Sequence, residues 1–132
     1  MSPPERSPHP LRVLLADDNH INQRLGVAVI QQLGHRVTVV SDGLEALAAV
    51  ERETFDVVLL DLEMPNLDGV GAAQAIHARH GADRPYLLAL SASTPDDVRQ
   101  ACLSAGMDAF LSKPFSIDAL ARALAQVPVR GS

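Results

Sequence analysis

Three aspartates in this chain stand directly after apolar runs, at places where a β-strand would end. Asp17 and Asp18 follow the run 11–16, and Asp61 follows the run 57–60. Carboxylates held within a few ångströms repel one another, and one or more would take up a proton unless a cation joined them. Mg²⁺ relieves such repulsion because it prefers oxygen ligands and is commonly bound by one or two carboxylates. The pattern indicates a site for a hard divalent cation.

A site of this kind would suit phosphoryl chemistry. Asp61 ends an unbroken apolar run, and a carboxylate can act as the nucleophile that forms an aspartyl phosphate. Phosphoryl transfer depends on positioning and charge neutralisation more than on acid–base groups. The cation on Asp17 and Asp18, together with the ammonium group of Lys113, would neutralise the developing charge. Ser91, which follows another apolar run, could donate a hydrogen bond to a phosphoryl oxygen.

Short apolar runs alternate with longer segments of helical spacing, and these elements must position the polar residues. The runs are 11–16, 37–40, 57–60, 86–90 and 109–111. The run 57–60 has no polar alternation, which is typical of a strand covered on both faces. The alternation predicts an α/β fold of βαβ units around a parallel sheet. Ligands bind such sheets outside the carboxyl ends of the strands, where the polar residues stand.

Capping residues mark the ends of the expected helices. In the first helix, apolar residues recur at every fourth position: Ile21, Leu25, Val29 and Leu33. Gly34 and Gly106 are suited to ending two helices, because glycine accepts the left-handed backbone found there. Asp42 with Glu45 three residues later predicts a capping box, and Ser116 predicts the start of the last helix.

Composition limits the class of protein. The chain has 132 residues, enough for one domain, and we expect residues 1–10, with four prolines, to be a disordered leader or linker. Residues 11–127 should form the domain and 128–132 a disordered tail. A net charge of −5 argues against direct nucleic-acid binding. The single Cys102 excludes an internal disulfide, and no apolar run approaches the ~20 residues of a membrane helix. We therefore expect a cytoplasmic location.

The sequence resembles the receiver domain of two-component response regulators over residues 11–127. Four pieces in family order and spacing carry the resemblance: LLADDNHINQRL, VVLLDLEMPNLDG, LLALSAS and FLSKPF. The resemblance implies the flavodoxin-like (βα)5 receiver fold, doubly wound, with five parallel strands in the order 2-1-3-4-5. The piece DDNHINQRL is more similar to receivers fused to hybrid histidine kinases than to those of transcription factors.

The resemblance also implies a role for each site residue. Asp17 and Asp18 would hold Mg²⁺ or Mn²⁺ together with Asp61 and the backbone carbonyl of Glu63. Asp61 would be the phosphoacceptor. Lys113 would match the lysine of the family's site, and Ser91 and Phe110 would match its switch hydroxyl and switch aromatic residue.

The function implied is a phosphorylation switch. A histidine kinase or histidine phosphotransfer protein would donate a phosphoryl group to Asp61; Ser91 would then move inward and Phe110 would repack. This change would bias the face formed by the fourth helix, the strand 109–111 and the fifth helix, which a partner reads. The chain would be a monomer or a weak dimer through that face. It would be a signalling domain that promotes its own phosphorylation and dephosphorylation, and its parent could be a membrane-anchored hybrid kinase.

Three other readings compete with this one. A flavodoxin shares the expected architecture, but Asp17 and Asp18 would repel the cofactor phosphate from the first strand–helix loop. A phosphatase with an aspartate nucleophile would place that nucleophile after the first strand, in a D-x-D pattern that this chain lacks. A phosphorylation-independent interaction module on the receiver fold is the third reading, and an intact Asp61 and Lys113 argue against it.

Overall fold

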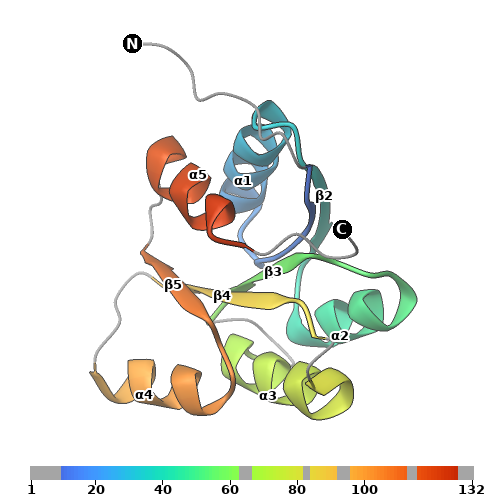
Figure 1. The fold of residues 1–132 in the computed structure, drawn as a ribbon, viewed down its shortest axis with the longest axis vertical. Helices are drawn as coiled ribbons and strands as arrows, with labels where there is room; N and C mark the ends of the chain where they lie inside the picture. Colours follow the sequence, from blue (N-terminus) through green and yellow to red (C-terminus); the bar gives the residue numbers. More distant parts are fainter. Residues whose placement is uncertain (1–9, 63–66, 82–83, 92–95, 113–115, 128–132) are drawn as a thin grey trace.

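The computed structural model describes residues 10–62, 67–81, 84–91, 96–112 and 116–127. Strands and helices alternate along these residues, as the apolar runs predicted (Figure 1). The strands are β1 (Arg12–Ala16), β2 (Arg36–Val40), β3 (Val57–Asp61), β4 (Tyr86–Ser91) and β5 (Ala109–Ser112). The helices are α1 (His20–Gln32), α2 (Gly43–Arg52), α3 (Gly69–His80), α4 (Asp96–Ser104) and α5 (Ile117–Ala125). Nearly all of the expected leader and tail lies outside the described residues.

The strands form one parallel sheet in the order β2-β1-β3-β4-β5. This is the 2-1-3-4-5 order implied by the family resemblance, so the predicted fold class is confirmed. The chain leaves β1 for β2 on one side and returns to β3 on the other, and the strand order therefore reverses between β1 and β3. A sheet of this type binds ligands at that reversal, outside the carboxyl ends of the strands.

Helices cover both faces of the sheet (Figure 1). Alternate residues of each strand enter two separate apolar clusters: Leu15 and Leu59 belong to the cluster beneath α1 and α5, and Leu14 and Leu60 to the one beneath α2, α3 and α4. Every residue of β3 is buried, as expected for a strand covered on both faces. Burying one such leucine stabilises the fold by about 1.5–3 kcal/mol.

The helix ends follow most of the capping predictions. Gly34 and Gly106 follow α1 and α4 with φ of 91° each, a left-handed backbone that glycine adopts without strain. The Asp42 carboxylate accepts a hydrogen bond from the Glu45 N–H at 2.8 Å. The second half of the expected capping box differs, because the Glu45 carboxylate accepts from the N–H of Ser41 at 2.7 Å rather than from that of Asp42.

Helix α1 buries only the second half of the apolar series Ile21, Leu25, Val29 and Leu33. The buried residues in and just after this helix are Gly26, Val29, Ile30 and Leu33. These lie at positions i, i+3, i+4 and i+7, which form one helical face. Ile21 and Leu25 lie beside that face and are 76% and 39% exposed. The first half of α1 therefore presents apolar side chains to solvent.

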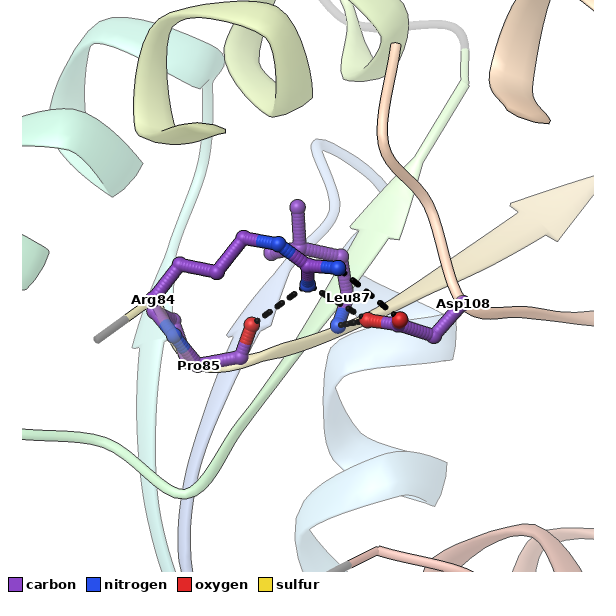
Figure 2. Close-up of polar contacts among 4 residues, drawn as sticks. All are labelled: Arg84, Pro85, Leu87 and Asp108. Atoms are coloured by element: carbon purple, nitrogen blue, oxygen red, sulfur yellow. Dashed lines mark hydrogen bonds and ion pairs between the residues drawn. The ribbon is translucent and has the colours of Figure 1, made fainter. Parts of the chain in front are cut away.

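A partly exposed ion pair between Arg84 and Asp108 fastens the starts of β4 and β5 (Figure 2). The Arg84 guanidinium donates two hydrogen bonds to Asp108, at 2.6 and 3.0 Å, and the Leu87 N–H donates to the same carboxylate at 2.8 Å. Burial alone would raise the pKa of Asp108, but hydrogen bonds from Arg84 and Leu87 and the Arg84 charge together lower that pKa. The hydrogen bond to Asp108 raises the pKa of Arg84.

His35 is a structural residue rather than a surface one. Its ring is buried, with 7% of the residue exposed, and its Nδ1 accepts a hydrogen bond from the Leu11 N–H at 2.8 Å. Burial lowers the pKa of this imidazole, which favours the neutral form that the hydrogen bond requires.

Among the described residues, none of the helices is both long enough and apolar enough to cross a membrane.

Candidate functional site

The three aspartates meet at the carboxyl edge of the sheet. One carboxylate oxygen from each of Asp17, Asp18 and Asp61 lies within 4.8 Å of the others. The register explains this meeting, because Ala16 of β1 pairs with Leu60 of β3. Asp17 and Asp61 directly follow these paired residues, and Asp18 follows Asp17. Asp17 and Asp61 are 0% and 5% exposed, whereas Asp18 is exposed. The fold thus produces the acidic cluster that the sequence predicted.

Hydrogen bonds hold the loop between β1 and α1 in place. The Asp17 carboxylate accepts from the Asn19 N–H at 2.9 Å. Asn19 in turn caps α1, because its side-chain oxygen accepts from the N–H groups of Ile21 and Asn22 at 2.9 and 3.1 Å. The Asp17 N–H donates to the carbonyl of Val40 at 3.1 Å, which joins the loop to β2. The acidic pair therefore stands on a braced turn.

Gln23 is a supporting residue that the sequence analysis did not single out. Its side-chain amide donates a hydrogen bond to the backbone carbonyl of Asp17 and another to the Ser41 hydroxyl at 3.3 Å. It therefore connects α1 to the loops after β1 and β2. A glutamine in the first turns of an amphipathic helix usually faces solvent, so its residue type alone carries no signal of this role.

Gly69 allows α3 to begin directly against the backbone beside Asp61. A Cβ atom at this position would lie 2.5 Å from the Asp61 carbonyl oxygen and 3.0 Å from the Leu62 Cα. The first distance is shorter than a non-bonded contact allows and the second is tight, so only glycine fits without movement of the backbone. Asp68 caps the same helix by accepting from the Gly71 N–H at 2.8 Å. The glycine of the motif PNLDG therefore has a packing reason.

The two switch candidates lie close together on the sheet. Ser91 ends β4 and pairs with Ser112, while Phe110 pairs with Ala89. Because residues two apart on a strand share a face, Phe110 and Ser91 lie diagonally opposite on the face that α4 covers. Phe110 is half-buried against the apolar cluster of that face. The other two site predictions, Lys113 and Glu63, lie outside the described residues.

The acidic cluster fits a small divalent cation. All three donors are carboxylates, the ligand type that Mg²⁺ and Mn²⁺ prefer. Oxygens around one octahedral Mg²⁺ lie roughly 3–4 Å apart, given Mg–O distances of about 2.1 Å. The 4.8 Å limit on the separations between Asp17, Asp18 and Asp61 is close to this range. Small side-chain adjustments would bring the three oxygens onto one ion.

A protein-family model matches most of this chain. The model of the response regulator receiver domain matches residues 13–125. The chain belongs to the response regulator receiver domain family. The domain is thus a receiver domain of a two-component phosphorelay system.

Individual relatives agree with this assignment. The sensor histidine kinase GacS of Pseudomonas protegens is 38% identical over 123 residues, which are 90% of this chain and 13% of that kinase. The chain therefore spans only a small part of the curated relatives it matches. The solved receiver domain of the sensor histidine kinase PA1611 from Pseudomonas aeruginosa is 38% identical with a TM-score of 0.82, and the match covers 89% of this chain and 97% of that one. That receiver holds a magnesium ion in its active-site cleft.

A chemotaxis regulator shows the same architecture. The CheY4 protein of Vibrio cholerae superposes with a TM-score of 0.85 at 28% identity, and the match covers 90% of this chain and 99% of that one. The two proteins superpose over nearly their full length, so the elements β1 to α5 of this chain have the CheY-like receiver fold.

Proposed function

We propose that Asp61 is the phosphoacceptor of this receiver and that Asp17 and Asp18 hold the required Mg²⁺ with it. The observation that carries the proposal is the buried Asp61 at the end of β3, with a carboxylate oxygen within 4.8 Å of oxygens from Asp17 and Asp18. The backbone carbonyl of Glu63 would complete the protein ligands. When bound, the cation would neutralise the charge of the carboxylates and of the incoming phosphoryl group.

The transfer itself requires little of the protein besides positioning. An Asp61 carboxylate oxygen forms a bond to phosphorus while the phosphorus–nitrogen bond of a phosphohistidine breaks. The electron pair of that bond stays on the imidazole nitrogen of the donor, and the product on this chain is an acyl phosphate. The braced turn of Asp17 and the close approach of α3 at Gly69 keep the carboxylates in position. Lys113 would balance the charge of the new dianion.

The phosphoryl group would be read through Ser91 and Phe110. A dianion on Asp61 attracts the Ser91 hydroxyl, and Phe110 then repacks toward the space that Ser91 leaves. Their diagonal placement on the α4 side of the sheet supports this coupling. The phosphoryl group shifts the equilibrium between two arrangements of the face formed by α4, β5 and α5. The size of the shift is set by the difference between its interaction free energies with the two arrangements.

Intact mass after incubation with acetyl phosphate and Mg²⁺ tests the phosphoacceptor. The wild type should gain one phosphoryl group, the Asp61→Asn variant none, and chelation of the metal should abolish the gain. Asp118→Asn, which removes an exposed carboxylate of α5, is the matched control and should behave as the wild type. No gain in the wild type would point instead to an interaction module that works without phosphorylation.

The exposed start of α1 is the surface we propose for the phosphohistidine donor, either a histidine kinase or a histidine phosphotransfer protein. Ile21 and Leu25 present apolar side chains there, one helical turn from the loop that carries Asp17 and Asp18. Exposed apolar residues beside a reactive site are typical of docking surfaces. A donor seated on them would bring its phosphohistidine to Asp61.

Replacing Ile21 by aspartate separates docking from chemistry. We expect Ile21→Asp to slow phosphorylation by a protein donor roughly tenfold or more, the size of a hot-spot loss, while phosphorylation by acetyl phosphate is unchanged. Leu103→Asp is the matched control, because Leu103 is 53% exposed on α4, another helix. Equal slowing with both donors would mean that Ile21 affects the site rather than docking.

We also propose that this receiver is part of a hybrid sensor histidine kinase. The support is that GacS is 38% identical over a stretch forming 13% of its length, and that the PA1611 receiver belongs to a sensor histidine kinase. In such a kinase, residues 11–127 would be a cytoplasmic domain that is itself phosphorylated and does not turn over a separate substrate. Residues 1–10 would form a leader before this domain, and residues 128–132 a tail after it.

We expect the domain to be a monomer or a weak dimer through α4, β5 and α5. Analytical ultracentrifugation would distinguish the two states.

A further inference from the structure

Helix α4 places an arginine over the switch aromatic residue. The guanidinium carbon of Arg99 lies 5.1 Å from the centroid of the Phe110 ring. A cation within about 6 Å of an aromatic face is attracted by the ring quadrupole. The ion pairs formed among the described residues do not include Arg99. Among the described residues, the Phe110 ring is thus an interaction partner of the Arg99 guanidinium.

The location of Phe110 makes this contact relevant to the switch. The ring is half-buried: it packs on the cluster beneath α2, α3 and α4, and Arg99, which is exposed, covers it. Ser91 lies diagonally across from Phe110 on the same face. The 5.1 Å contact holds for the ring position described here, and a ring that repacks toward Ser91 leaves that position. The contact is lost in that movement unless the start of α4 follows.

We propose that Arg99 acts as a latch: its contact stabilises the Phe110 ring in the position described here and so opposes the phosphorylated arrangement. The inference rests on the proposed switch role of Phe110 and adds a residue that sets its balance. The direction of the effect on activation distinguishes this latch from a purely electrostatic role of Arg99. A positive charge near the site would by itself favour an anionic phosphoryl group, so a purely electrostatic Arg99 would assist activation. A latch would oppose it.

Titration with beryllofluoride in the presence of Mg²⁺ tests the latch, since this anion forms a phosphoryl-like adduct on a carboxylate. The amide signals of Asp61 and Ser91 in NMR spectra of the whole chain report half-saturation. Arg99→Gln should lower the half-saturating concentration by roughly two- to five-fold, the size of an exposed cation–π contact. Arg99→Lys, which keeps a cation, should restore part of the wild-type value.

Two controls isolate the ring contact. Arg52→Gln removes the same charge from an exposed position on α2 and should leave the titration unchanged. In a Phe110→Leu background, Arg99→Gln should also have no effect. In the protein without beryllofluoride, the side-chain proton signals of Arg99 should show a ring-current shift that Phe110→Leu abolishes.

These measurements distinguish failure of the latch from failure of the proposed phosphoacceptor function. If the wild type binds no beryllofluoride, the phosphoacceptor proposal fails and the latch fails with it. If the wild type binds and Arg99→Gln has no effect or raises the half-saturating concentration, only the latch is overturned. Absence of the ring-current shift would likewise overturn it.

Discussion

At the scale of single residues, the absence of a Cβ atom at Gly69 allows α3 to approach Asp61 closely. We predict that Gly69→Ala destabilises the domain by about 1–3 kcal/mol, the usual cost of overpacking. The clashing atoms are backbone atoms of Asp61 and Leu62, which cannot move without displacing the site. The rate of phosphorylation by acetyl phosphate should fall as well. Urea denaturation and intact mass measure the two effects.

A neighbouring glycine provides the matched control. A Cβ atom at Gly71 would meet the Leu67 Cδ1 at 2.6 Å, but this atom is the end of a flexible side chain that can move away. Gly71→Ala should be close to neutral, because alanine is also favoured over glycine inside a helix by about 1 kcal/mol. Equal losses of stability and phosphorylation rate in both variants would show that the approach of α3 at Gly69 has no special role.

Residue types predicted the acidic cluster, but not its supports. Asp17 and Asp61 could be placed from sequence because each ends an apolar strand, and the ends of adjacent parallel strands meet at one edge. Gln23 could not be placed, because its partners Asp17 and Ser41 become its neighbours only after α1 has packed on the sheet. A side chain that bonds to backbone and hydroxyl groups leaves no pattern in the chain.

At the scale of elements, the Arg84–Asp108 pair joins β4 to β5. We predict that Asp108→Asn costs about 1–3 kcal/mol of stability at neutral pH, since hydrogen bonds to a charged group are lost. The asparagine can still accept from the Leu87 N–H, so the residual bond limits the loss. Chemical denaturation gives this value, and Asp118→Asn, at an exposed position on α5, is the control.

The same pair predicts part of the acid sensitivity. The folded-state pKa of Asp108 is lowered from its ordinary 3.8, so the unfolded chain binds this proton more readily than the folded one. The stabilisation is complete above the unfolded pKa and is lost as pH falls through the folded pKa. Asp108→Asn should therefore lose less stability than the wild type over that acid range. If the free energies of unfolding of the variant and the wild type fell in parallel as the pH is lowered, this role of Asp108 would be contradicted.

Sequence alone could not show this pair, although it predicted the elements that the pair joins. The strands β4 and β5 were visible as apolar runs, and Gly106 marked the end of α4 between them. Arg84 and Asp108 are 24 residues apart in sequence, and they meet only because the pairing of β4 with β5 brings Asp108 beside Leu87, within reach of the Arg84 side chain. The sequence could not show which part of the apolar series of α1 is buried, for a related reason. Apolar residues at regular spacing serve equally for packing and for the exposed surface of Ile21 and Leu25.

At the scale of the whole molecule, a cation in the acidic cluster would stabilise the fold. The oxygens that meet within 4.8 Å come from residues that follow β1 and end β3, so they converge only in the folded chain. A ligand that binds the folded state alone stabilises it by RT ln(1 + [L]/Kd), which is about 2.7 kcal/mol at one hundred times Kd. We therefore predict that Mg²⁺ raises the free energy of unfolding in proportion to the logarithm of its concentration once the site is saturated.

The Asp18→Asn variant connects this stabilisation to the site. Asp18 is exposed, so the variant removes one ligand and one of three neighbouring negative charges without opening the core. Without Mg²⁺ it should be at least as stable as the wild type, because the repulsion of Asp18 with the other two carboxylates is removed. With Mg²⁺ it should gain much less. Urea denaturation at constant ionic strength, with NaCl replacing MgCl₂, excludes general screening. An equal gain in both proteins would place the stabilising Mg²⁺ away from the acidic cluster, and the metal role proposed for Asp18 would be wrong.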